Sequence, residues 1–317
     1  KVIKKKTSTI ISGVGIGGLS STKKNLYMGN SGTATRLMLG LLCNQNFEAK
    51  FIGDKSLSNR NMHELIKPLR KMGAKINSKN NKLPIIIKGF NETMPIIYNQ
   101  KNPSAQIKSA ILIASLNSPG LTTIIENTPT RNHTEILLRK IGAKIQIKKF
   151  KKKKIIKITG QKELKAKNIS IAGDPSAASI IGSAALITPE SEIKIMKVNI
   201  NKTRTTFFNI LKKMNAKIKI SNKKRVSNEQ VGDITFKSSN LKGVHLGKET
   251  VANMIDEMPA FFIAASLAEG ITKVKDAKEL RTKESDRLQV MSEVLESFGV
   301  KFRLEDDGII INGLGKS

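Results

Sequence analysis

Four short polar motifs stand where apolar helices are expected to begin, and their residue types suit the binding of anions. A helix N-terminus leaves backbone N–H groups unpaired and carries the positive end of the helix dipole, so it binds phosphate and carboxylate readily. The same residue types also act as ordinary N-caps. Because the motif recurs at equivalent places, we expect several helix N-termini to face a common cleft. The motifs are Asn30-Ser-Gly-Thr33, Ser104-Ala-Gln106, Gly173-Asp-Pro-Ser176 and Asp256-Glu257.

Basic residues recur in the four loops that lead into a second set of helices. An arginine binds phosphate or carboxylate through two parallel hydrogen bonds, and a lysine supplies a point charge. Half of the ten arginines lie in these loops, which weakens the alternative that they are only solvated surface charges. We therefore expect an anionic ligand with more than one acidic group. The five arginines in these loops are Arg60, Arg131, Arg204, Arg281 and Arg287.

An internal repeat supplies the elements that position these residues. Pro68-Leu-Arg-Lys-Met-Gly-Ala-Lys-Ile76 recurs as Leu137-Leu-Arg-Lys-Ile-Gly-Ala-Lys-Ile145, with weaker copies at 210–218 and 294–302. In each copy an apolar helix ends at a residue that accepts the left-handed conformation, and an extended segment follows. The residues that end these helices are Gly73, Gly142, Asn215 and Gly299. Successive members of this set are 69, 73 and 84 positions apart along the chain, so each repeat has the size of a domain fragment.

Each repeat is expected to run helix, strand, helix, strand, strand. The first helices are expected at residues 31–42, 104–116, 175–187 and 256–268. The strands after them are expected at residues 47–53, 121–126, 192–198 and 271–275. Because these helices show little polar stripe, they should be buried on most sides. The sequence thus predicts an α/β fold with helices inside and sheets outside.

A boundary near residue 168 divides the repeats into two lobes. Residues 7–13 resemble the closing strand of a repeat whose beginning is absent, so we expect sequence to be missing before them. The N-terminal lobe, residues 1–168, is expected to hold two complete repeats and the end of another. The C-terminal lobe, residues 169–317, is expected to hold two repeats.

The composition excludes several classes of protein. The 317 residues are 39% hydrophobic and 26% charged, which is typical of a soluble globular protein with room for two domains. The longest apolar stretch, residues 258–268, is well short of the roughly 20 residues that cross a bilayer. One cysteine cannot form an internal disulfide and no secretory leader is recognisable, so we expect a cytoplasmic protein.

The net charge of +31 comes mainly from lysine. Lysine accounts for 46 of the 56 basic residues, and lysine, isoleucine and asparagine share adenine- and thymine-rich codons. Nucleic-acid binders usually gather charge on one face and interleave aromatic residues, whereas here the lysines are scattered and Trp is absent. The densest run, residues 148–154, is expected to form a solvated hairpin tip. A basic field that attracts small anions is the favoured interpretation, with a basic nucleic-acid-binding protein as an alternative.

Other chemical signals are weak. A G-x-G-x-x-G pattern at residues 13–18 is followed by neither a convincing helix nor the acidic residue of a dinucleotide site. The three histidines lack the spacing of metal ligands, and no metal site is expected. Cys43 ends an apolar helix and is interpreted as a core residue.

Four segments in order along the chain resemble the EPSP synthase (3-phosphoshikimate 1-carboxyvinyltransferase) family. They are Gly29-Asn-Ser-Gly-Thr-Ala-Thr-Arg36, Pro103-Ser-Ala-Gln-Ile-Lys-Ser-Ala110, Gly173-Asp-Pro-Ser-Ala-Ala178 and Glu279-Leu-Arg-Thr-Lys-Glu-Ser-Asp-Arg287. The resemblance implies an inside-out α/β barrel of βαβαββ-type units, six in all in two lobes that close on substrate. Four complete units are visible here. The family's K-S-x-S-x-R and G-D-H-R motifs are absent, so the sequence is expected to be truncated at both ends.

The resemblance also implies a reaction and a set of site residues. The enolpyruvyl group of phosphoenolpyruvate is transferred to the 5-hydroxyl of shikimate 3-phosphate, without metal or organic cofactor. The resemblance assigns Asp256 as the base and Glu284 as the acid. The residues expected to hold phosphoenolpyruvate are Asn30, Ser31, Gly32, Arg60, Lys283 and Arg287, and those for shikimate 3-phosphate are Ser104, Gln106, Thr130 and Arg131.

The resemblance further implies a monomer when the protein is complete, no membrane or specific nucleic-acid partner, and inhibition by glyphosate. Thr130 stands where the family often has Ser, and Ala105 where many members have a second Ser. A related alternative is a UDP-N-acetylglucosamine enolpyruvyl transferase. That family carries its characteristic cysteine in a loop, whereas Cys43 is expected in a helix.

Overall fold

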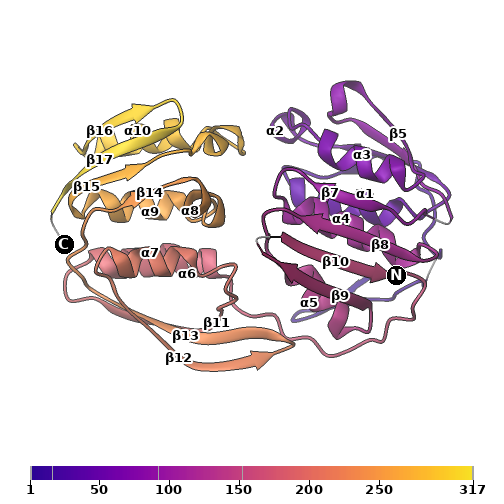
Figure 1. Ribbon diagram of the computed structural model, residues 1–317, viewed down its shortest axis with the longest axis horizontal. Coiled ribbons are helices and arrows are strands. Elements are labelled where there is room, and N and C mark those ends of the chain that lie inside the picture. The colour runs from indigo at the N-terminus through magenta and orange to yellow at the C-terminus, as the bar shows by residue number, and fades with distance from the viewer. Residues whose placement is uncertain (1, 16, 92, 152, 316–317) are drawn as a thin grey trace. The chain divides into compact units, whose positions relative to one another are not determined.

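The computed structural model describes residues 2–15, 17–91, 93–151 and 153–315 (Figure 1). The chain divides into two compact units, Lys1–Lys167 and Asn168–Ser317. Each unit has its own hydrophobic core and contains two complete repeats. A short, exposed antiparallel hairpin of β1 (Val2–Lys4) and β2 (Thr9–Ile11) precedes the repeats of the first unit.

The two repeats of the N-terminal unit have the same topology. The first repeat consists of β3 (Leu26–Tyr27), α1 (Gly32–Leu42), β4 (Glu48–Ile52), α2 (Lys55–Ser58), α3 (His63–Lys71), β5 (Lys75–Ser78), η1 (Lys79–Asn81) and β6 (Ile85–Lys88). The second consists of β7 (Ile97–Gln100), α4 (Ala105–Ala114), η2 (Ser115–Asn117), β8 (Leu121–Glu126), α5 (His133–Lys140), β9 (Lys144–Phe150) and β10 (Lys153–Thr159). Their sheets run β3-β4-β6-β5 and β7-β8-β10-β9, with the first pair parallel and the others antiparallel.

The C-terminal unit repeats this plan. Its first repeat consists of α6 (Pro175–Ile187), β11 (Glu192–Asn199), α7 (Thr206–Lys213), β12 (Lys217–Val226) and β13 (Glu229–Lys237). Its second consists of β14 (His245–Leu246), α8 (Lys248–Asn253), α9 (Met258–Ser266), β15 (Glu269–Val274), η3 (Lys278–Thr282), α10 (Arg287–Ser297), β16 (Lys301–Glu305) and β17 (Gly308–Leu314). The sheets run β11-β13-β12 and β14-β15-β17-β16, and a single parallel bridge from Gly173 to Val198 replaces the first strand of the smaller sheet.

The expected helix-inside arrangement is seen most plainly in the C-terminal unit, where α6, α7 and α9 lie between the two sheets (Figure 1). The helix α9 is apolar over most of its surface and carries two fully buried phenylalanines, Phe261 and Phe262. The helix α4 buries seven of its ten residues. A helix without a polar face is stable only when neighbours cover it on several sides. The predicted arrangement of helices inside and sheets outside is therefore confirmed.

The residues predicted to end the second helices adopt the left-handed conformation. Gly73, Gly142, Asn215 and Gly299 have φ angles of 106°, 102°, 70° and 69°. This conformation lets the backbone N–H groups after the helix bond back to its last carbonyls, as Ala74 N does to Leu69 O at 3.1 Å. The repeat thus marks the places where each second helix must stop.

Two expected helices differ in their bounds by two residues at one end or both. The helix expected over 104–116 ends at Ala114 and tightens into the 3-10 turn η2. The helix expected from residue 256 begins at Met258, with Asp256 in the preceding turn. Pro259 explains the later start, because proline fits the first helical turn but in the interior would remove a hydrogen bond and clash with a carbonyl.

The expectation of a solvated tip at 148–154 is wrong for one lysine. Lys148, Lys149, Lys151 and Lys153 are exposed, and Lys152 lies outside the described residues. Lys154 is only 5% exposed, because alternation along β10 turns its side chain inward.

We expect Gly40→Ala to destabilise the N-terminal unit by about 1–3 kcal/mol, the usual range for overpacking. A Cβ at Gly40 would lie 2.4 Å from Ala110 O, and this backbone atom of α4 cannot retract unless the two helices separate. Gly13→Ala is the control, since Gly13 is exposed and a Cβ there meets nothing within 4 Å. Urea unfolding of both variants measures the difference, and equal stabilities would contradict the close contact.

Candidate active site

The N-terminus of α1 is flanked by two guanidinium groups. Ser31 caps the helix, its Oγ accepting the Ala34 N–H at 3.1 Å. Arg60, from the loop after α2, donates to Asn30 Oδ1 at 2.8 Å. A Cβ at Gly32 would lie 2.7 Å from Arg36 Nη1 and 2.9 Å from Arg60 Nη1. Cationic side chains and the positive end of a helix therefore meet at one glycine, as an anion site requires.

The N-terminus of α4 is hydrogen-bonded to that of α1. Gln106 Nε2 donates to Thr33 Oγ1 at 2.6 Å, and Arg36 Nη1 donates to Gln106 Oε1 at 2.7 Å. Ser104 caps α4 by accepting the Ile107 N–H at 3.4 Å. These contacts place two helix N-termini side by side, which the recurrence of the motif predicts for the N-terminal unit.

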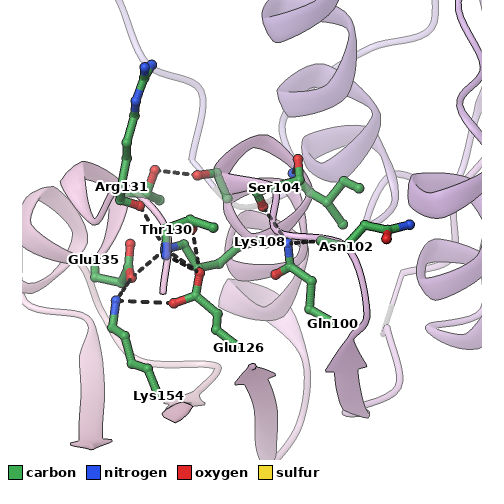
Figure 2. A network of polar contacts seen from close by, with 12 residues as sticks. Gln100, Asn102, Ser104, Lys108, Glu126, Thr130, Arg131, Glu135 and Lys154 are labelled. Carbon is green, nitrogen blue, oxygen red and sulfur yellow. Dashed lines mark hydrogen bonds and ion pairs between the residues drawn. The ribbon is translucent and has the colours of Figure 1, made fainter. Parts of the chain in front are cut away.

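The loop between β8 and α5, residues 127–132, carries Thr130 and Arg131 (Figure 2). Thr130 N donates to Glu126 Oε1 at 3.1 Å, and the Thr130 hydroxyl donates to the same oxygen. Lys108 Nζ donates to Arg131 O at 2.7 Å. The Arg131 side chain extends away from these contacts, so its backbone and its guanidinium have different surroundings.

Four buried charged side chains meet beneath this loop (Figure 2). Lys108 Nζ lies 3.1 Å from Glu126 Oε1 and 3.0 Å from Glu135 Oε1. Lys154 Nζ lies 3.4 Å from Glu126 Oε2 and 2.7 Å from Glu135 Oε1. All four side chains are at most 6% exposed, so their charges are desolvated and must balance. Removal of one member of such a cluster typically destabilises a protein by about 3–5 kcal/mol.

In the C-terminal unit, one arginine contacts both candidate proton-transfer residues. Arg287, at the start of α10, donates to Glu284 Oε2 at 3.0 Å and lies 3.7 Å from Asp256 Oδ1. A bond of 2.8 Å from Arg287 Nη1 to Ile255 O holds the guanidinium in place. The Asp256 and Glu284 side chains are 40% and 49% exposed, so both are accessible to a ligand. Two partly exposed carboxylates are thus gathered around one guanidinium.

Lys283 and Arg281, from the same motif, have different roles. Lys283 Nζ contacts Glu279 at the surface. Arg281 pairs with Asp286 at 2.8 Å and also donates to Asp306 O and Glu305 O. Arg281 therefore secures the loop through contacts within the protein.

Asp286 caps the N-terminus of α10. Burial tends to raise the pKa of the Asp286 carboxyl, but the Gln289 N–H and the Arg281 guanidinium outweigh burial and lower it. The carboxylate form of this cap is thereby favoured at neutral pH.

The Arg204 guanidinium is also hydrogen-bonded to other side chains of the protein. Its Nη2 lies 2.6 Å from Ser176 Oγ and 3.3 Å from both Asp174 Oδ1 and Glu257 Oε1. Glu257 is 3% exposed and accepts a hydrogen bond from Ser176. The arginine joins the first turn of α6 to the residue before α9. The inference that all five loop arginines serve an anionic ligand is therefore not supported for Arg204.

The candidate residues are divided between the two units, and each unit holds one group of them. The N-terminal group contains Asn30, Ser31, Gly32, Arg60, Ser104, Gln106, Thr130 and Arg131, and the C-terminal group contains Asp256, Lys283, Glu284 and Arg287. Sequence reasoning did not single out Arg36, although it stands one helical turn after Gly32, where a side chain reaches the same face. It also gave no role to Lys108, Glu126 or Glu135, because nothing in a lysine-rich sequence distinguishes a buried charge from an exposed one.

Cys43 is fully buried at the C-terminal end of α1. Burial raises the pKa of the Cys43 thiol to about 12, and the Ala74 backbone N–H only partly opposes this effect. A thiol that stays protonated and inaccessible cannot act as a nucleophile or general acid. Among the described residues, no group of three or more His, Cys, Asp and Glu side chains could hold a metal ion.

Comparisons with known proteins show which proteins this chain is similar to. The family model for EPSP synthase (3-phosphoshikimate 1-carboxyvinyltransferase) matches residues 1–316. A 3-phosphoshikimate 1-carboxyvinyltransferase from Zymomonas mobilis is 43% identical over 96% of this chain and 67% of its own length. One from Ruthia magnifica is 45% identical over 96% of this chain and 69% of its own length. A solved EPSP synthase from Acinetobacter baumannii superposes with a TM-score of 0.84 at 41% identity, covering all of this chain and 71% of that one.

We expect Cys43 of the folded protein to resist the thiol reagent DTNB at pH 8. The thiolate is the reactive form, and a pKa of about 12 leaves almost none of it. Absorbance at 412 nm should rise only as fast as the protein unfolds, whereas protein in guanidinium should release one equivalent at once. Rapid labelling of the folded protein would contradict the buried position.

Proposed function

The chain belongs to the EPSP synthase family, and on that premise we propose that it transfers the enolpyruvyl group of phosphoenolpyruvate to the 5-hydroxyl of shikimate 3-phosphate, releasing inorganic phosphate. The observation that carries the proposal is the contact of Arg287 with both Asp256 and Glu284. The reaction needs a base, an acid and cations for two phosphates and two carboxylates, and these residues supply the first two around one cation.

The first step is an addition. Asp256 removes the proton of the 5-hydroxyl, and the oxygen forms a bond to C2 of phosphoenolpyruvate. The C2–C3 π electrons take a proton from Glu284, so that C3 becomes a methyl group and C2 becomes tetrahedral. In the second step the carboxylate of Glu284 takes a proton back from C3, the double bond re-forms, and the bond from C2 to the phosphate oxygen breaks, its electron pair leaving with the phosphate. The products are the enolpyruvyl ether and inorganic phosphate.

Phosphoenolpyruvate is assigned to the cations and to the N-terminus of α1. Arg60, Lys283 and Arg287 provide positive charge, and Asn30, Ser31 and Gly32 provide the start of the helix. The absence of a side chain at Gly32 lets the ligand approach between the arginine side chains that flank it. The bond from Arg60 to Asn30 supports this assignment, because it brings a cation to the same helix end.

Shikimate 3-phosphate is assigned to Ser104, Gln106, Thr130 and Arg131. Ser104 and Gln106 belong to the first turn of α4, where backbone N–H groups favour a phosphate. The Thr130 hydroxyl donates its hydrogen bond to Glu126, so it contacts the ligand as an acceptor, which suits a ligand hydroxyl. Arg131 supplies the charge that pairs with the phosphate.

Two alternatives are not favoured. A UDP-N-acetylglucosamine enolpyruvyl transferase would use a cysteine in a loop, and Cys43 is buried at the end of a helix. A nucleic-acid-binding protein would not need a base and an acid around one arginine.

No helix of the described residues is long and apolar enough to cross a membrane. We further propose that the protein acts as a monomer in the cytoplasm.

Phosphate release should require both substrates. The assay measures inorganic phosphate released from phosphoenolpyruvate in the presence of either shikimate 3-phosphate or UDP-N-acetylglucosamine. We expect turnover with the first acceptor only. Turnover with the second, or none with either, would contradict the proposal.

Asp256→Asn and Glu284→Gln should each lower kcat by about 100- to 10,000-fold, the usual contribution of a general acid or base. The dissociation constant of shikimate 3-phosphate should change far less, since neither carboxyl is assigned to its phosphate. Glu296→Gln, an exposed position on α10, is the matched control and should retain full activity. Near-normal turnover in either test variant would remove that residue from the mechanism.

Gly32→Ala should raise the inhibition constant of glyphosate by a larger factor than the KM of phosphoenolpyruvate. The added methyl would lie within 3 Å of Arg36 and Arg60 and displace the ends of both side chains. Glyphosate is longer than phosphoenolpyruvate, so the narrowed site should exclude it more. Steady-state inhibition measures both constants, and equal factors would show that Gly32 does not line the inhibitor's part of the site.

A further inference from the structure

The buried charge cluster of Lys108, Glu126, Glu135 and Lys154 contacts the loop 127–132 through only two of its members. Lys108 donates to Arg131 O at 2.7 Å, and Glu126 accepts from both the backbone and the hydroxyl of Thr130. Lys154 contacts the same two glutamates as Lys108 and lies on β10, away from the loop sequence. The cluster therefore contains one lysine that binds the loop and one that only balances charge.

Charge balance alone does not explain why this position holds ions. A buried ion pair can often be replaced by apolar side chains of similar volume without loss of stability. Apolar side chains could fill the space beneath the loop, but they could not bind Arg131 O or Thr130 N. Bonds from charged groups are shorter and stronger than neutral ones, so they hold these backbone atoms closely.

The two residues held in this way are those assigned to shikimate 3-phosphate. A fixed backbone at Arg131 restricts where its long side chain can present the guanidinium, and ordering of the loop before binding lowers the entropy lost on binding. The same bonds set the direction of the Thr130 hydroxyl, because its proton is directed at Glu126.

We propose that Lys108 and Glu126 are positioning residues for the acceptor substrate, fixing the loop 127–132 so that Thr130 and Arg131 bind the phosphate-bearing ring. This inference rests on the proposed function for the identity of the ligand. The arrangement of the loop itself does not depend on that identity.

Two balanced double variants separate positioning from stability. Lys108→Met/Glu135→Gln and Lys154→Met/Glu135→Gln each remove one buried cation and one buried anion, so each leaves one lysine paired with Glu126. Only the Lys108 double variant loses the hydrogen bond to Arg131 O. We expect it to raise the KM for shikimate 3-phosphate about tenfold or more, as loss of a charged hydrogen bond predicts, with little change in the KM for phosphoenolpyruvate. The Lys154 variant should keep both constants near those of the unmodified protein.

Equal increases in the KM for shikimate 3-phosphate in the two variants, or no increase in either, would overturn the proposal. The single change Lys108→Met is a weaker test, because an unpaired buried charge can prevent folding. Thermal melts of the double variants show whether each is folded.

Amide hydrogen exchange of residues 127–132 tests the positioning without substrate. We expect exchange in this loop to be about tenfold faster or more in the Lys108 double variant than in the Lys154 double variant. Equal exchange in the two would overturn the positioning role even if the enzyme is active. If the unmodified protein neither bound nor converted shikimate 3-phosphate, the proposed function would be contradicted. Faster exchange of this loop in the Lys108 double variant would still support the role of Lys108.

Discussion

The close contact between α1 and α4 is the constraint on which the N-terminal group of site residues depends. Gly40 packs against the backbone of Ala110, and any side chain there would collide with a carbonyl oxygen. Because the two helices approach at this glycine, their N-termini are near enough for Gln106 to reach Thr33 and for Arg36 to reach Gln106. A helix N-terminus alone is a weak anion site. Two of them joined by hydrogen bonds, with guanidinium groups beside them, form a strongly positive surface.

The charged residues of this protein serve three purposes that their sequence positions do not distinguish. Arg204 and Arg281 are bound by carboxylates and carbonyls of the chain, and they hold helix starts and loops in place. Lys108 and Lys154 are buried and neutralise two glutamates. Arg287 contacts the two carboxylates assigned to proton transfer. The high net charge therefore says little about function, because the role of each charged residue depends on the groups that it contacts.

Much of the fold could be predicted from the sequence because its signals are local. The repeat of a helix ending in Gly73, Gly142, Asn215 or Gly299 reflects a backbone conformation that few residues adopt, and that conformation is observed at each position. The apolar first helices were predicted as buried, and α4 and α9 are. Errors occurred where a local signal was ambiguous, as at Asp256, which precedes α9 because Pro259 delays the start of the helix.

The repeat, most helix starts and the motifs typical of the family are recognisable in the sequence, since each depends on residues close together along the chain. The tertiary structure alone decided which charges are buried. Lys108 and Lys154 are separated by 46 positions and stand among many lysines, yet they share Glu126 and Glu135. Burial of a charge depends on what the fold brings around it, and the alternation along β10 shows only which face of the strand carries Lys154. Helical spacing places Arg36 on the same face as Gly32, but its contact with Gln106 depends on the packing of α4 against α1.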